Sequence, residues 1–151
     1  MALNLNALET SFDLVAPRGE ELVELFYARL FTAAPTVVPL FAGTDLSKQR
    51  TKLLVTLVLL RKSLRDLDAL VPTLRELGRR HVGYGARPEH YAVVGDTLIG
   101  AMAEVAGDAW RDEYTRAWAD ALSVVAEAML SGTGSSPTAP AAVGVPSPAA
   151  T

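Results

Sequence analysis

Apolar residues recur at spacings of three and four along almost the whole chain, and the alternating pattern of strands is missing. This spacing places apolar side chains on one face of an α-helix, whose repeat is 3.6 residues. The apolar stretches are separated by prolines and glycines, which end helices or are tolerated in their first turn. The pattern therefore predicts an all-α fold built from amphipathic helices.

The breaks give the expected bounds of the helices. We expect helices over residues 5–15, 20–33, 47–64, 72–84, 88–105 and 109–130, with a short turn over residues 35–40. Asp45 or Ser47 is the expected N-cap of the third helix, because its side-chain oxygen can accept from the unpaired amides of the first turn. Pro72 and Pro88 are expected in the first turns of their helices, where the missing amide hydrogen does no harm.

The composition changes after Leu130. The segment 131–151 has four prolines, no charge and no large apolar side chain, so it cannot bury enough surface to offset its ordering entropy. We therefore expect one domain over residues 1–130 and a disordered tail over residues 131–151. By composition alone, the tail is expected to be a passive end of the chain.

Composition also excludes several kinds of function. The chain of 151 residues has no cysteine, which excludes disulfides, iron–sulfur clusters and Cys-ligated zinc. Its net charge of −3 gives no general attraction to nucleic acid or to anionic membranes. The most apolar run, residues 53–60, is far shorter than the roughly 20 residues of a membrane span. The N-terminus lacks the basic start of a signal peptide, so we expect a cytoplasmic protein.

One apolar stripe contains a histidine. It consists of residues spaced four, three, four and three apart: Leu70, Leu74, Leu77, His81 and Tyr84. His81 is therefore expected to point inward, and two interpretations stay open. It is either a core histidine with hydrogen-bonded ring nitrogens, or a ligand of a metal or haem. A neutral imidazole offers one lone pair to iron while its other N–H donates to a backbone carbonyl.

Two other polar residues begin or interrupt apolar faces. Gln49 starts a stripe that continues through Leu53 and Leu57, and it is either solvated or a donor aimed into an apolar pocket. Tyr27 either keeps its hydroxyl in water or directs it into a pocket. The motifs HExxH, GxSxG, GxxxxGK[ST] and GxGxxG are absent.

Together these residues resemble the bacterial single-domain globins of the flavohaemoglobin-like class, over about residues 5–130. The matching features in chain order are FYARLF from Phe26, PTVVPLF ending at Phe41, Gln49 with Leu53, LxxLGRRHxxYG, PEHYxxVG, and a last helix entered at Trp118. The resemblance implies a globin fold, in which crossed helices surround a haem pocket, and haem b as the cofactor.

The resemblance also implies roles for individual residues. His81 would be the proximal iron ligand, with Tyr91 beside it, and Tyr27 and Gln49 would donate to the bound ligand. Lys48 is the alternative to Gln49, because the preceding loop varies in length. Arg79 or Arg80 would meet a haem propionate, or else both belong to a solvated basic face. The other residues expected to line the pocket are Phe41, Leu53, Leu57, Leu77, Val94 and Leu98. His90 is assigned no role.

The sequence departs from the flavohaemoglobin pattern at two positions. Counting from Trp118, the glutamate expected late in the last helix falls at about Ser136, and Glu127 is too early to take its place. The tyrosine expected four residues after Trp118 is Leu122. These departures predict globin-like rather than peroxidase-like proximal chemistry. No flavin or nicotinamide domain follows, so electrons would have to come from a separate reductase.

The expected function is reversible binding of O2 and other diatomic gases such as NO and CO. Nitric oxide dioxygenation is expected if a reductase supplies electrons. The alternative is a haem-based gas or redox sensor that acts through a partner protein. A third interpretation, a haem-free helical interaction domain, is opposed by the pattern around Gln49 and His81. The oligomeric state stays open.

Overall fold

The computed structural model describes residues 3–83 and 88–131, and every regular element within these ranges is helical. The α-helices are α1 (Leu5–Val15), α2 (Gly19–Ala33), α3 (Leu46–Lys62), α4 (Leu67–Gly83), α5 (Pro88–Ala106) and α6 (Asp112–Ser131). Short 3-10 turns connect them: η1 (Ala16–Arg18), η2 (Pro35–Phe41), η3 (Leu64–Asp66) and η4 (Gly107–Ala109). The predicted all-α class is confirmed. Tyr84, Gly85 and the predicted tail from residue 132 lie outside the described residues.

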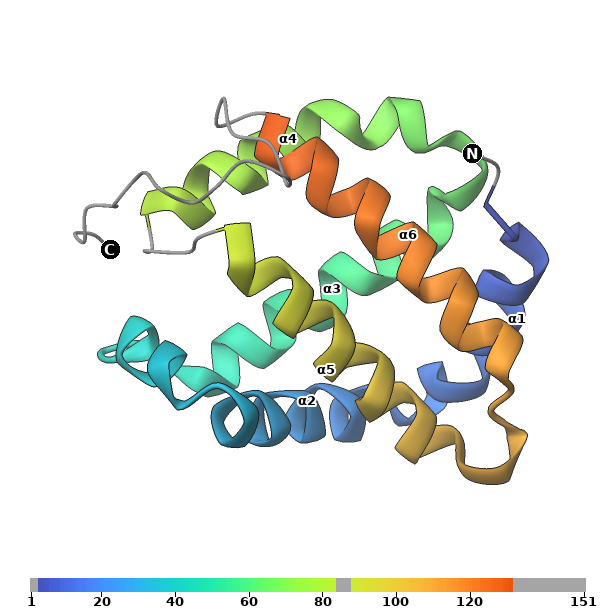
Figure 1. Ribbon diagram of the computed structural model, residues 1–151, viewed down its shortest axis with the longest axis horizontal. Coiled ribbons are helices and arrows are strands. Elements are labelled where there is room, and N and C mark those ends of the chain that lie inside the picture. Colours follow the sequence, from blue (N-terminus) through green and yellow to red (C-terminus); the bar gives the residue numbers. More distant parts are fainter. Residues whose placement is uncertain (1–2, 84–87, 132–151) are drawn as a thin grey trace.

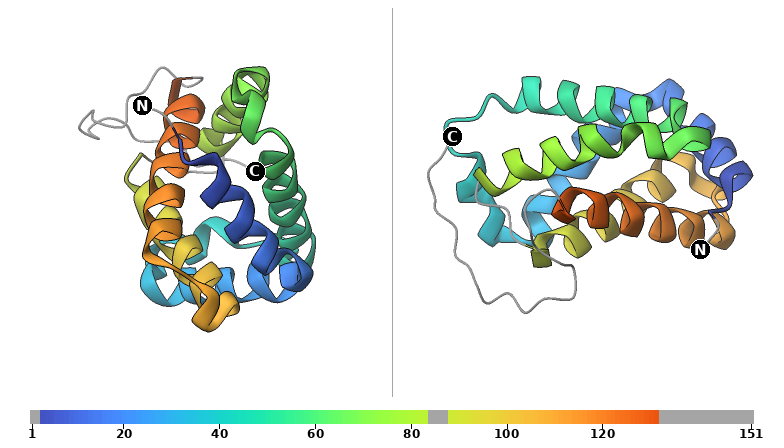
Figure 2. Two further views of the ribbon diagram at one scale, coloured as in Figure 1. Left: turned by 90° about the vertical axis from the view of Figure 1, so that its right-hand side faces the viewer. Right: turned by 90° about the horizontal axis from the view of Figure 1, so that it is seen from above.

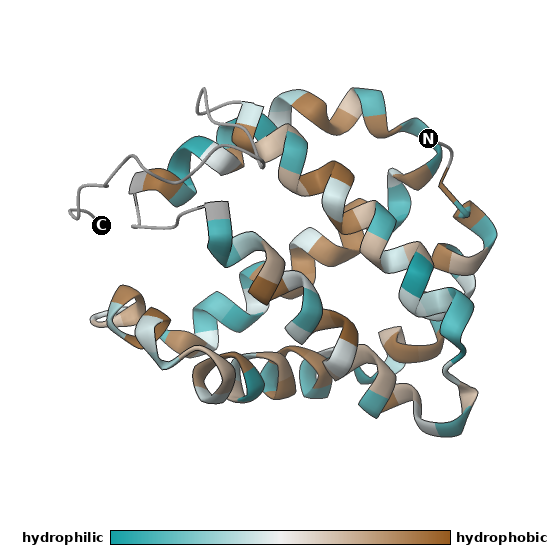
Figure 3. Cartoon of the chain, in the orientation of Figure 1, coloured by the Kyte–Doolittle hydropathy of each residue, from teal (hydrophilic) through white to brown (hydrophobic). Residues whose placement is uncertain are grey.

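The helices cross one another rather than forming a parallel bundle (Figure 1). Helix α2 packs against α3 and α5, and α6 packs against α1, α4 and α5. The side-on and top views show the same crossed arrangement (Figure 2). Hydrophobic and hydrophilic residues alternate around each helix, as expected where one face of each helix is buried (Figure 3).

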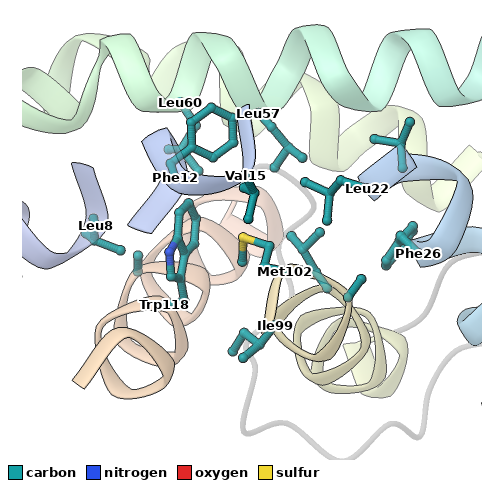
Figure 4. Close-up of a cluster of buried hydrophobic side chains, with 14 of the residues drawn as sticks. Leu8, Phe12, Val15, Leu22, Phe26, Leu57, Leu60, Ile99, Met102 and Trp118 are labelled. Atoms are coloured by element: carbon teal, nitrogen blue, oxygen red, sulfur yellow. The ribbon is translucent and has the colours of Figure 1, made fainter. Parts of the chain in front are cut away.

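A closed core lies where α1, α5 and α6 meet. Its apolar side chains point toward one another around Trp118, Val15 and Met102, which are fully buried (Figure 4). The polar atoms in this core are paired: the Trp118 indole Nε1 donates to Ser11 Oγ at 2.8 Å, and the Ser11 hydroxyl lies 2.6 Å from the Ala7 carbonyl oxygen. The bond between Trp118 and Ser11 joins the last helix, α6, to the first, α1.

The start of α4 was predicted wrongly. The helix begins at Leu67, so Pro72 lies in its interior and not in its first turn. Proline there removes one amide hydrogen and leaves the Asp68 carbonyl without its helical donor. Pro72 and Asp68 are both exposed, so water can replace that donor. The helix extends before Pro72 because Leu70 and Leu74, at helical spacing, are both buried in the core.

Other helix bounds agree with the predictions to within two residues, except at α6. That helix begins at Asp112 instead of residue 109, because Gly107 adopts a left-handed φ of 61° and starts the η4 turn. Asp112 and Glu113 then occupy the first turn of α6, where the helix dipole stabilises their negative charge.

Asp45, rather than Ser47, is the N-cap of α3, and it accepts from the amides of Ser47 and Lys48.

Among residues 3–83 and 88–131, no helix combines the length and the apolar composition that a bilayer-spanning segment needs.

Candidate functional site

A cavity of about 640 Å³ lies between α3, α4, α5 and α6. Its volume is within the range of pockets that hold cofactors and small molecules. Most of its walls are apolar side chains, with a few polar groups among them. Of the residues predicted for the site, the cavity is lined by Leu57, Leu77, Arg80, His81, Tyr91 and Val94.

His81 lies in the last turn of α4 with its ring half-buried at this cavity. Its Nδ1 is 2.8 Å from the carbonyl oxygen of Leu77, one turn earlier in the helix. A carbonyl only accepts, so in the neutral ring Nδ1 holds the proton and Nε2 holds the lone pair. Burial lowers the pKa of His81 and outweighs the opposite effect of the Leu77 hydrogen bond. The ring is therefore held in the neutral form that can ligate a metal.

Tyr91 lies in the first turns of α5 and lines the same cavity. Its ring centroid is 6.5 Å from that of His81, and the two rings are tilted by 42°. Burial raises the pKa of Tyr91 to about 12, so its phenol keeps its proton at physiological pH. The structure therefore brings together the predicted histidine and tyrosine, from two different helices.

Tyr27 lies in a separate aromatic cluster formed by Phe26, Tyr27 and Phe31 of α2 with Phe41 of η2. The side chain is 6% exposed, and the Tyr27 ring meets Phe26 edge-on at 4.9 Å and Phe41 at 5.7 Å. Burial raises the pKa of Tyr27, while a side-chain hydrogen bond with Gln49 and the charge of Arg50 act in the opposite direction. Tyr27 and Gln49 are thus brought together, whereas Lys48 is exposed.

Helix α3 connects this aromatic cluster to the cavity. Gln49, Leu53 and Leu57 follow one another at spacings of four, so they share one face of the helix. Leu53 and Phe41 are half-buried against the hydrophobic core, and Leu57 lines the cavity. Leu98 is 3% exposed and belongs to the core rather than to the cavity lining. The predicted set is therefore divided between two adjoining regions.

Charged residues lie at one edge of the cavity. Arg80 lines it, and the Arg80 Nε lies 3.8 Å from an oxygen of Glu76, which also lines it. Arg79 pairs with the same carboxylate at 2.6 Å. Of the two arginines proposed for a propionate, Arg80 is the one in the cavity lining, and it is largely exposed.

Sequence reasoning missed several residues of the cavity wall. His90, to which no role was assigned, lies in the lining, half-buried and one turn before Val94. The α6 wall is formed by residues at helical spacing: Leu122, Val125, Ala126 and Met129. That spacing was a signal for a buried face, but only the packing of α6 on α4 shows which space it faces. The position predicted for the missing acid, Ser136, lies outside the described residues, and Glu127 is exposed.

Comparison with known proteins agrees with this arrangement. The family model described as Globin matches residues 24–129. A flavohemoprotein of Bacillus subtilis is 29% identical over 128 residues, covering 83% of this chain and 32% of that protein. One of Deinococcus radiodurans is 33% identical over 114 residues, covering 74% of this chain and 28% of that protein. The chain thus spans about a third of the length of these relatives.

Solved structures share the fold. A bacterial globin from Campylobacter jejuni superposes with a TM-score of 0.75 at 22% identity, covering 86% of this chain and 94% of that chain. An engineered carbene transferase from Rhodothermus marinus, described as a candidate nitric oxide dioxygenase, gives 0.73 at 23% identity, covering 81% of this chain and 84% of that chain. Since the family model matches most of the described residues, and the crossed helices have the globin arrangement, this chain belongs to the globin family.

Proposed function

We propose that the chain binds haem b in the cavity between α3, α4, α5 and α6, with His81 Nε2 as the proximal ligand, and that it binds O2, NO and CO reversibly. The observation that supports this most is the geometry of His81. Its Nδ1 lies 2.8 Å from a backbone carbonyl, which directs the lone pair to Nε2 at an apolar cavity. When bound, haem supplies an iron that takes diatomic ligands and changes redox state.

The cavity residues fit such a group. A planar apolar macrocycle needs apolar walls, and Leu57, Leu77 and Val94 supply them from three different helices. The propionates of haem are anionic, and Arg80 at the edge of the cavity has the planar guanidinium that pairs well with carboxylates. Glu76 now holds Arg80 at 3.8 Å, a long contact that a carboxylate of the ligand can replace.

Tyr27 and Gln49 are proposed to act on the gas ligand. The Gln49 side chain lies near enough to the Tyr27 hydroxyl to act on its pKa, and Phe26 and Phe41 pack against the Tyr27 ring. Aromatic neighbours exclude water, and hydrogen-bond donors in such a low-dielectric region stabilise partial negative charge more than water does. This pair would therefore favour O2, which becomes polar on binding, over CO.

Nitric oxide dioxygenation is the proposed reaction when electrons are available. Support comes from the curated relatives, which are named flavohemoprotein, and from the Rhodothermus marinus protein. The chain matches about a third of each flavohemoprotein, and the proposed reaction needs a reductase to supply its electrons.

The test is haem reconstitution followed by absorption spectroscopy and a pyridine haemochrome assay. Wild type is expected to take up one haem b and to give distinct ferrous and carbonyl spectra. His81→Ala should lose the haem or hold it weakly. His90→Ala is the matched control, because it removes the other described histidine of the same cavity and should retain haem. Full haem occupancy with an unchanged ferrous spectrum in His81→Ala would overturn the assignment.

A further inference from the structure

Gly78 lies where α4 touches the backbone of α6. A Cβ placed on it would lie 2.0 Å from the carbonyl oxygen of Met129, 2.5 Å from its carbonyl carbon and 2.8 Å from its Cα. All three are backbone atoms, which cannot rotate away as a flexible side chain can. Because glycine is a poor helix former, its place inside α4 is explained by this close approach rather than by helix propensity.

The contact lies in the turn that holds the proximal histidine. Gly78 precedes His81 by three residues, so the two are neighbours on the helix surface. Leu77, the adjacent residue, provides the carbonyl that lies 2.8 Å from His81 Nδ1. One turn of α4 therefore fixes both the rotation of the imidazole and the distance of the helix from α6.

Helix α6 is a firm support at this point. Met129 and Leu130 are 6% and 2% exposed, so the backbone that meets Gly78 belongs to the buried part of the helix. One turn earlier in α4, Arg75 Nε donates to Ser131 Oγ at 3.2 Å. The C-terminal end of α6 meets α4 in Figure 1, and the top view of Figure 2 shows the two helices next to one another.

We propose that Gly78 is a positioning residue for the haem ligand, because it lets α4 rest directly on α6 and so sets how far His81 reaches into the cavity. This inference rests on the proposed haem function. Real Cβ atoms do not approach other atoms more closely than 3.0 Å, so a side chain here would move α4 by about 1 Å or more. A displacement of that size at the ligand changes the iron–histidine bond.

The test compares Gly78→Ala with Gly100→Ala, a glycine inside α5. At Gly100 a Cβ would come within 2.9 Å of Arg29 Nη1, the end of a flexible side chain that can move away. Both substitutions improve helix propensity equally. We expect Gly78→Ala to shift the ferrous iron–histidine band in resonance Raman spectra and to release haem about tenfold faster or more, as when the supporting contacts of a metal ligand are removed. Gly100→Ala should do neither.

A second background shows whether the effect passes through His81. In His81→Gly protein supplied with imidazole, the iron ligand is no longer attached to α4. Adding Gly78→Ala there should leave the iron–imidazole band unchanged, and a persisting shift would mean a general disturbance and overturn the proposal. So would an unchanged band and haem release rate in Gly78→Ala, or a variant that fails to fold. If wild type takes up no haem, the proposed function is overturned, and this inference with it.

Discussion

The core around Trp118 and the cavity beside His81 are built from similar apolar side chains but are completed differently. In the core, Trp118, Val15 and Met102 are fully buried, and the Trp118 indole nitrogen has a buried partner in Ser11. At the cavity, apolar residues stay open to solvent: Val94 is 37% exposed and Leu59 is 41% exposed. The core is thus complete without a ligand, whereas part of the cavity wall, including Val94 and Leu59, stays exposed and would be buried further by a ligand in the cavity.

The largest expected effect is the loss of Trp118. Trp118→Ala removes a fully buried side chain and leaves Ser11 without its indole donor, so the free energy of unfolding should fall by about 3–5 kcal/mol. Chemical denaturation of the haem-free protein measures this. Trp110→Ala is the control, because Trp110 is only half-buried, and its effect should be clearly smaller. Equal effects at the two positions would remove the distinction between the core and the surface.

Filling the cavity should come next in size. A ligand that binds only the folded state stabilises it by about 4 kcal/mol when present at 1,000 times its dissociation constant. Haem should therefore raise the unfolding midpoint and slow amide exchange in the last turn of α4 and the first turns of α5. Exchange of the core amides around Trp118, which open only by global unfolding, should slow by the same free energy. If haem protected the core and left those turns unaffected, the cavity would not be where it binds.

The aromatic cluster on α2 is tested through ligand kinetics. Tyr27→Phe removes only the hydroxyl and keeps the ring against Phe26 and Phe41. A hydrogen bond to a charged acceptor contributes about 1.5–3 kcal/mol, so O2 should dissociate about ten or more times faster. CO dissociation should change far less, and Gln49→Leu should act in the same direction but more weakly. Stopped-flow displacement measures all of these rates.

An unchanged O2 dissociation rate in Tyr27→Phe would mean that the hydroxyl does not reach the ligand. The aromatic cluster would then be only a structural part of the α2–α3 contact, and the preference for O2 would need another origin.

The smallest expected effect is at the cavity wall without haem. Val94→Ala should change the stability of the haem-free protein by less than about 0.5 kcal/mol, because Val94 is still 37% exposed. Leu98→Ala, one turn later on α5, removes a side chain that is 3% exposed and should cost about 2–5 kcal/mol. Denaturation of both variants with and without haem is the measurement. With haem present the Val94→Ala loss should increase, and a loss that is the same in both forms would contradict a ligand-completed wall.

The periodicity of the sequence was enough to predict each helix and the inward direction of His81. It was not enough to place Pro72, because a proline inside a helical pattern usually marks the first turn of a helix. Here the burial of Leu70 extends α4 to residues before the proline. The α6 wall of the cavity and the role of Gly78 were also missed. Both depend on which helices lie side by side, and local spacing does not contain that information.

The site was predicted residue by residue from a resemblance, and the structure divides the set. His81, Tyr91 and Leu77 meet at the cavity, while Tyr27 and Phe41 pack in the aromatic cluster, with Gln49 beside Tyr27. Spacing along one helix places Gln49 and Leu57 on a common face, but the distance between that face and His81 depends on how α3 packs.

The central claim is that His81 holds a haem iron through Nε2, with a backbone carbonyl as its Nδ1 partner. Resonance Raman spectroscopy of the ferrous protein measures this most directly, through the iron–histidine stretching band. A histidine that donates to a carboxylate becomes more basic and strengthens that bond, and a carbonyl partner does so less. We predict a band in the range of globins that disappears in His81→Gly without added imidazole. A band in the range of peroxidases, or one that persists in His81→Gly, would contradict the account.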